Sequence, residues 1–82
     1  MNINMEDVRN RDKRFCQFPK YDYDDTVQSK RLHVHHIDGD KNNCGMYNLI
    51  SLCGKHHAVV EGNPHSWEDY FYTITISYES YQ

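Results

Sequence analysis

The strongest constraint on the fold is the segment LHVHHIDGD at residues 32–40, together with the residues up to Pro64. Residues 31–37 alternate in the manner of a β-strand, and the Asp, Gly and Asn residues after them predict a turn and a loop. Leu49–Leu52 predicts a second short strand. Gly54–Glu61 predicts a helix, which Gly-Asn-Pro should end. Together these segments predict a ββα unit.

The flanking segments give a less complete prediction. Residues 5–14 lack Gly and Pro, so we expect a short surface helix with Asn4 as its N-cap. Residues 15–25 contain a proline and an aromatic-acidic run, which predicts an irregular loop over the core. Residues 66–72 are typical of a capped helix, whereas residues 73–78 alternate like a strand. Both readings of the C-terminal segment stay open.

From the chain length we expect one small domain. Its 82 residues bury a small fraction of their surface, so a bound metal or a partner would help the chain to stay folded. We expect one α+β domain over residues 1–82. Its core, at about residues 30–62, would hold two short antiparallel strands and a helix. An N-terminal helix and a C-terminal extension over residues 64–82 would complete it.

Composition argues against several other classes of protein. No apolar stretch approaches the ~18–20 residues that a membrane span requires, and the N-terminus lacks the apolar region of a signal peptide. We therefore expect no membrane association and a cytoplasmic location. The chain has three cysteines, and in a reducing cytoplasm cysteines are more often metal ligands or buried side chains than disulfides. We expect no disulfide.

The net charge of −3 argues against a broad electrostatic grip on nucleic acid, because nonspecific affinity comes from Lys and Arg that neutralise phosphates. The charge is uneven, however. Arg11 and Arg14 lie in the predicted N-terminal helix, and Lys30 and Arg31 precede the histidine strand. These four side chains are either phosphate contacts or parts of an ordinary solvated surface.

Strand and helix geometry separates the histidines by direction. Successive residues on a strand face opposite sides, so we do not expect His35 and His36 to bind the same ion. His57 and Glu61 are four residues apart on the predicted helix and share a face. His35, His57 and Glu61 thus form a three-ligand set with open positions, as catalytic metals have. Histidine exchanges protons near neutral pH, so His36 beside this set suits the removal of a proton from water.

These residues resemble the HNH endonucleases, which have the ββα-metal fold. The resemblance covers about residues 11–61 and rests on Arg11-Asp12, Phe15-Cys16-Gln17, Leu32-x-Val34-His35-His36-Ile37-Asp38-Gly39-Asp40, Asn43, Asn48-Leu49, Leu52-Cys53 and His57. It implies that His35 and His57 bind the metal. It also implies that His36 is the general base and that Asn48 braces the loop that holds this base in place.

The reaction implied by the resemblance is metal-dependent hydrolysis of a DNA phosphodiester. His36 would take a proton from the attacking water, and one divalent ion would stabilise the phosphate. The products would carry 5′-phosphate and 3′-hydroxyl ends. The helix and its loop would enter the minor groove and grip phosphates, so we expect nicking or cutting of DNA with low sequence specificity.

One departure from the family's commoner pattern concerns zinc. Many members bind a structural zinc through two Cys-x-x-Cys pairs, whereas Cys16, Cys53 and His56 are the residues that stand at such positions here. Either these three recruit another ligand, such as Cys44 or His65, and bind zinc, or they belong to the core.

A second departure concerns the catalytic metal. Glu61 stands where a third histidine is common in the family, which shifts the site toward Mg²⁺ or Mn²⁺ without excluding Zn²⁺ or Ni²⁺. His33 lies on the same strand face as His35. We leave His33 outside the ligand set, as a surface residue or as a partner of a ligand.

The expected partner is DNA. Compact stand-alone members of the family often come from bacteriophages, so we expect a phage protein that a terminase or another recruiting protein brings to DNA in the host cytoplasm. The alternative is a noncatalytic binding module of a phage or nucleoprotein assembly, in which a metal only holds the fold. A purely structural site would not need His36. The aromatic residues Trp67, Tyr70, Phe71 and Tyr72 are expected to be core rather than a partner surface.

Overall fold

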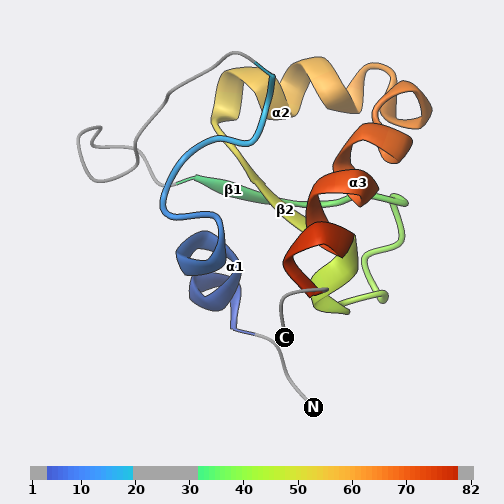
Figure 1. Ribbon diagram of the computed structural model, residues 1–82. Helices are drawn as coiled ribbons and strands as arrows, with labels where there is room; N and C mark the ends of the chain where they lie inside the picture. The colour runs from blue at the N-terminus through green and yellow to red at the C-terminus, as the bar shows by residue number, and fades with distance from the viewer. Residues whose placement is uncertain (1–3, 20–31, 80–82) are drawn as a thin grey trace.

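Two short antiparallel strands lie at the centre of the fold, and helices pack around them (Figure 1). The computed structural model describes residues 4–19 and 32–79. Strand β1 (His33–His36) pairs with β2 (Leu49–Leu52) along its whole length. Helix α2 (Gly54–Glu61) follows β2 almost directly. The predicted ββα unit is confirmed, with β1 somewhat shorter than its alternating pattern.

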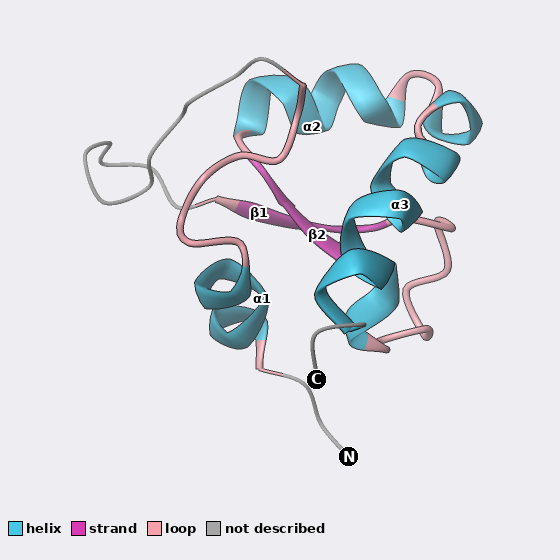
Figure 2. Ribbon diagram, in the orientation of Figure 1, coloured by secondary structure: helices cyan, strands magenta, loops and turns pink. Residues whose placement is uncertain are grey.

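Helices cover both sides of the strand pair (Figure 2). In that view α1 (Met5–Arg11) lies below the strands and α2 lies above them. Helix α3 (Glu68–Glu79) packs on β2 and on the short 3₁₀ helix η1 (Met46–Asn48) that precedes it. Because three helices contact β2, all four of its residues are buried. Over the described residues the fold is therefore α+β, as the sequence predicts.

A turn and a long loop connect the two strands. The turn begins at His36, whose carbonyl oxygen accepts a hydrogen bond of 2.9 Å from the amide of Gly39. Gly39 has a φ of +79°, which is left-handed backbone that glycine adopts without strain. The loop beyond this turn ends in η1. The predicted turn chemistry is confirmed, and the turn places the residues after β1 beside the end of the strand.

Helix α1 begins where the sequence predicts and ends earlier. The side-chain oxygen of Asn4 caps it by accepting a hydrogen bond of 2.8 Å from the amide of Glu6. The helix stops at Arg11, so the predicted end at residue 14 is wrong. Lys13 and Arg14 adopt left-handed backbone, with φ of 58° and 64°, and such residues cannot continue a right-handed helix. The chain then reverses and runs beside β2.

The C-terminal segment from Pro64 to Glu79 is helical except for a turn at Trp67. A short 3₁₀ helix, η2 (Pro64–Ser66), leads into α3, and residues 73–78 lie within α3 although their alternation also fits a strand. The helix buries Phe71 and Thr75, which lie one turn apart on the same face. The Thr75 hydroxyl also donates a hydrogen bond of 2.6 Å to the carbonyl oxygen of Tyr47. Burial of this face favours the helix over a strand.

One hydrophobic core joins these elements. Its buried members are Cys16, Leu32, Ile37, Ile50, Leu52, Cys53, Val60 and Phe71. Trp67 and Tyr72 pack against this core together with Phe71, as predicted, whereas Tyr70 is 41% exposed. Among residues 4–19 and 32–79, no helix has the length and apolar character that crossing a membrane requires.

Candidate metal centre

Three side chains meet between β1 and α2. His35 projects from β1 and is 3% exposed, and His57 and Glu61 lie one turn apart on α2. Glu61 Oε1 lies 2.9 Å from His57 Nε2 and 3.8 Å from His35 Nδ1. The potential ligand atoms of all three lie within 4.8 Å of one another. The fold thus brings together the three side chains that the spacing predicts, and they could hold a metal ion.

Two buried nitrogen atoms of this group lack hydrogen-bond partners. They are Nε2 of His35 and Nε2 of His57, and neither has a hydrogen-bond partner among the described residues. The 2.9 Å contact of His57 Nε2 with Glu61 Oε1 is that of an ion pair, which requires a protonated histidine. Buried polar atoms are normally paired. Two orphaned imidazole nitrogens beside a carboxylate therefore fit a site that a cation completes.

Burial favours the neutral form of both histidines. Desolvation lowers the pKa of His35 below its usual value of 6.5, and nearby His57 lowers it further, against the opposing effect of Glu61. Desolvation also lowers the pKa of His57, again against Glu61. Neutral imidazole is the form that binds a metal. Near neutral pH both side chains are therefore ready to serve as ligands.

His33 contacts this group from the neighbouring position on the same strand face. Its Nδ1 lies 2.8 Å from Nδ1 of His57, and the two rings meet edge to face at 90°. His33 is exposed and does not belong to the three-ligand group. Of the roles that the sequence leaves open, this contact supports that of a partner of a ligand.

His36 lies beside the three-ligand group without belonging to it. It is the last residue of β1, it is half-buried, and its Nε2 is a buried atom without a hydrogen-bond partner among the described residues. An open pocket of about 320 Å³ is lined by Val34, His35, His36, Gly39, Lys41, His57, Glu61 and Pro64. The strand ends at His36 and the chain turns there, so His35 and His36 line one pocket although neighbouring strand residues face opposite ways.

Lys41 is the cationic side chain of this pocket, and sequence reasoning misses it. It lies exposed on the loop after β1. Its sequence signal is weak, because a lysine after Asp-Gly-Asp is an ordinary turn residue. Its place in the pocket depends on the path of the loop, which periodicity does not predict.

Asn48 is fully buried and ties the loop together. Its Oδ1 accepts hydrogen bonds from the amide of Asp38 at 3.1 Å and from the hydroxyl of Tyr72 at 2.8 Å. Its Nδ2 donates to Asp38 Oδ1 at 2.9 Å and to the carbonyl oxygen of Asn43 at 3.0 Å. These bonds hold the residues directly after His36. The arrangement fits a loop brace of the kind that the resemblance implies, and Tyr72 is a member that sequence reasoning misses.

The same network favours the charged form of Asp38. Hydrogen bonds from Asn43, from the amide of Asp40 and from Asn48 hold the pKa of Asp38 below its usual value of 3.8. Burial raises the pKa of Tyr72, and the charge of Asp38 raises it further. The Tyr72 hydroxyl therefore remains a hydrogen-bond donor to the loop at neutral pH.

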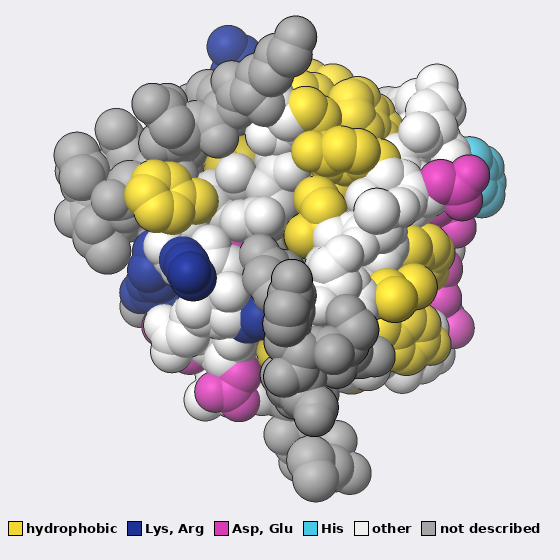
Figure 3. Space-filling model, viewed as in Figure 1, with side chains coloured by type: hydrophobic (Ala, Val, Ile, Leu, Met, Phe, Trp, Pro, Cys, Tyr) yellow, Lys and Arg dark blue, Asp and Glu magenta, His cyan; other side chains and the backbone are white. Residues whose placement is uncertain are grey.

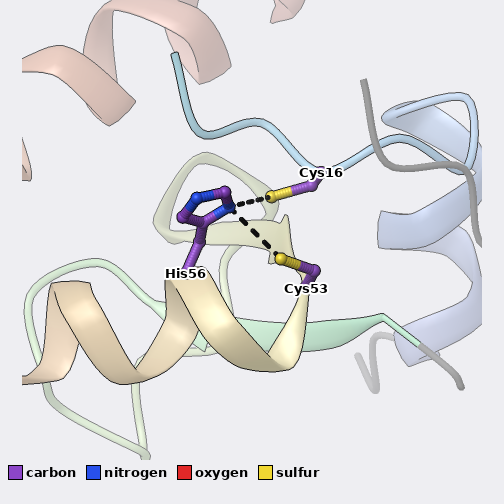
Figure 4. Close-up of side chains that lie close together, drawn as sticks. All are labelled: Cys16, Cys53 and His56. Atoms are coloured by element: carbon purple, nitrogen blue, oxygen red, sulfur yellow. Dashed lines mark hydrogen bonds between the residues drawn. The ribbon is translucent and has the colours of Figure 1, made fainter. Parts of the chain in front are cut away.

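A second group of side chains could also hold a metal ion (Figure 4). Cys16, Cys53 and His56 are buried, with His56 Nδ1 3.7 Å from Cys16 Sγ and 3.2 Å from Cys53 Sγ. Neither fourth ligand suggested by the sequence joins them. Cys44 and His65 are both exposed and make other contacts, so the structure places neither of them in this group.

The environment of these thiols also suits a metal-free core. Burial raises the pKa of Cys16 to about 11, and burial lowers the pKa of His56. The His56 ring stacks on Phe18 with a centroid distance of 4.0 Å and an interplanar angle of 2°. A metal would therefore have to displace thiol protons in order to bind. The observed geometry therefore fits both interpretations of the sequence, a zinc site and a part of the hydrophobic core.

Arg11 and Arg14, two of the four candidate phosphate contacts, pair with carboxylates within the fold, and the other two, Lys30 and Arg31, lie outside the described residues. The Arg11 side chain is 12% exposed and bonds Asp12 Oδ1 at 2.9 Å. It also donates to backbone carbonyl oxygens of η1 and β2. These contacts dock α1 against the strand pair, so Arg11 has a structural role in the fold.

Arg14 lies nearer the surface than Arg11. Its side chain is 28% exposed and pairs with Glu6 Oε2 at 2.9 Å. On the face seen in Figure 3, most of the Lys and Arg side chains gather on the left with an acidic patch below them, and further acidic side chains lie along the right edge. The uneven charge expected from the sequence is thus visible on this face.

Comparisons of the chain with protein-family models, with curated proteins and with solved structures find no match. Function is therefore inferred from the residues themselves. Among residues 4–19 and 32–79, two groups of side chains could hold a metal ion, and one of them lines an open pocket together with His36.

Proposed function

We propose that the protein is a metal-dependent endonuclease of the HNH type, which hydrolyses phosphodiester bonds of DNA. The observation that carries the proposal is the pocket shared by the three-ligand group and His36. A metal that only holds a fold needs ligands, but it does not need a further unpaired histidine beside it. The buried and unpaired Nε2 of His36 suits a group that accepts a proton from water.

The proposed ligands are His35, His57 and Glu61. Two imidazoles and one carboxylate suit Mn²⁺, Ni²⁺ or Zn²⁺, and the carboxylate also suits Mg²⁺. Three protein ligands leave positions for water and a phosphate oxygen. When bound, one divalent ion would polarise the phosphate and stabilise the charge of the leaving oxygen.

His36 would act on the attacking water. Its neutral imidazole takes one proton while the water oxygen forms a new bond to phosphorus and the bond from phosphorus to the 3′ oxygen breaks. The 3′ oxygen then takes up a proton, which leaves a 3′-hydroxyl and a 5′-phosphate. Asn48 contributes by geometry, because it holds the loop directly after His36.

Lys41 would supply the pocket's own contact to the anionic substrate. An exposed lysine gives charge without reading bases, so it favours low sequence specificity. The net charge of −3 and the inward position of Arg11 favour weak affinity for DNA by the chain alone. Both features suit a nuclease that another protein, such as a phage terminase, recruits to DNA.

The group of Cys16, Cys53 and His56 favours one alternative, a noncatalytic module in which zinc only holds the fold. Two thiolates and an imidazole are zinc ligands, and here they would join the segment after α1 to the start of α2. Co²⁺ distinguishes the groups, since thiolate ligands produce an intense charge-transfer absorption that imidazole and carboxylate do not. A module would show this absorption and no cleavage.

A plasmid assay tests the proposed function. Chelator-treated protein is incubated with supercoiled DNA and with Mg²⁺, Mn²⁺, Ni²⁺ or Zn²⁺ in turn. We expect nicked or linear products with at least one of these metals and none with chelator. His57→Ala should abolish cleavage, and His65→Ala, which removes an exposed histidine outside the pocket lining, should cut like the parent. No cleavage with any metal would exclude the enzyme.

A further inference from the structure

We propose that His33 is a positioning residue for His57, and that it holds the His57 ring so that Nε2 faces the metal. The inference rests on the proposed metal centre and deepens it, since it adds a residue that orients a ligand without being a ligand itself. Its basis is the contact of 2.8 Å between Nδ1 of His33 and Nδ1 of His57.

The contact is held by both elements that form the site. His33 is the first residue of β1, and its pairing with Leu52 fixes its backbone. Its ring lies against the first turn of α2, where a Cβ added to Gly54 would be 3.5 Å from two atoms of the ring. The His33 and His57 rings meet edge to face, with centroids 5.0 Å apart. The two Nδ1 atoms are therefore brought together by the strand and the helix, not by chance contact of two free side chains.

The contact decides which nitrogen of His57 is free. A distance of 2.8 Å between two ring nitrogens requires one of them to carry a proton and the other to accept it. When Nδ1–H of His57 donates to Nδ1 of His33, Nε2 of His57 keeps its lone pair, and it lies 2.9 Å from Glu61 Oε1. Ligating histidines commonly use their second nitrogen for such a bond, which fixes both tautomer and ring orientation.

Without His33 the ring could turn over. Rotation by 180° about the bond to the imidazole exchanges Nδ1 with a ring carbon and Nε2 with another, which removes the ligand atom from the site. Of the other described neighbours of the ring, His35 meets it at a steep angle, and Glu61 lies 2.9 Å from Nε2 without occupying Nδ1. The bond that His57 Nδ1–H donates to His33 Nδ1 therefore selects the orientation that binds metal.

Three variants of His33 isolate the role of its Nδ1. Asn places an amide atom near the position of Nδ1, whereas Gln places its amide one bond further out, and Ala removes the ring. Mn²⁺ affinity is measured from the loss of the free-ion EPR signal, with His57→Ala as the control that removes a ligand. We expect binding about 10–100-fold weaker in His33→Ala and His33→Gln, and near parental binding in His33→Asn.

The tautomer of His57 provides a readout that needs no metal. In the metal-free parent, long-range ¹H–¹⁵N spectra should show one fixed tautomer of His57, and in His33→Ala they should show averaged nitrogen shifts. Parental Mn²⁺ affinity in His33→Ala, or equal affinities in His33→Asn and His33→Gln, would overturn the inference. If the His33 variants weaken Mn²⁺ binding as expected but the parent protein cuts no DNA, only the proposed nuclease is overturned. A parent that binds no Mn²⁺ and shows averaged His57 shifts would overturn both.

Discussion

Replacement of Asn48 by alanine should destabilise the metal-free protein more than any change at an exposed loop residue. The side chain is fully buried and makes four hydrogen bonds, to Asp38 twice, to Asn43 and to Tyr72. Each such bond contributes about 0.5–1.5 kcal/mol net, so four give about 2–6 kcal/mol. The partners are only partly buried and regain some water contacts, so we expect a loss of about 3 kcal/mol. That is a large fraction of the stability of a small domain.

Urea unfolding followed by circular dichroism measures this loss. Tyr72→Phe is the matched control, because it removes one of the four bonds and keeps the ring; it should cost about 1 kcal/mol. The reasoning would be refuted if Asn48→Ala lost less than about 1 kcal/mol, or if Tyr72→Phe lost as much as Asn48→Ala.

Three further predictions concern other parts of the fold and site. Asp12→Ala should lower the free energy of unfolding by about 3–5 kcal/mol in urea titrations, because Asp12 is a buried partner of an inward-facing arginine. Folding lowers the pKa of His35 and of His57, so both bind protons more readily in the unfolded chain. The free energy of unfolding of the metal-free protein should therefore be highest above pH 6.5 and should fall as the pH drops below that value. Melting temperatures that are equal at about pH 7.5 and about pH 5.5 would contradict this sign. Lys41→Gln should raise KM for DNA with little change in kcat, whereas Lys55→Gln, the same change on α2 outside the pocket lining, should leave both at parental values.

The ββα unit is predictable because its signals are local. The alternation of β1, the turn at Gly39 and the stop after α2 each depend on a few neighbouring residues. The ends of the other helices depend on distant contacts. Helix α1 stops early at two left-handed residues, and α3 continues through a strand-like pattern because Phe71 and Thr75 are buried on one of its faces. Such tertiary burial is not visible in a short window of sequence.

Some residues of the candidate site are likewise predictable from local sequence signals, and others depend on distant contacts. His35, His57 and Glu61 are predictable because strand alternation and a four-residue helical spacing fix their directions. Lys41 and Tyr72 are not, because each reaches the site through the path of a loop or of a helix far along the chain. For the same reason the inward turn of Arg11 toward η1 cannot be read from its position on a charged helix.

The separation of metal binding from proton transfer is the central claim, and His36→Ala tests it most directly. The variant should bind Mn²⁺ like the parent, because His36 is outside the three-ligand group. Its cleavage of supercoiled plasmid should fall by about 10²–10⁴-fold, the usual contribution of a general base. Cleavage at the parental rate, or loss of Mn²⁺ binding together with cleavage, would contradict the assignment of His36 as the base.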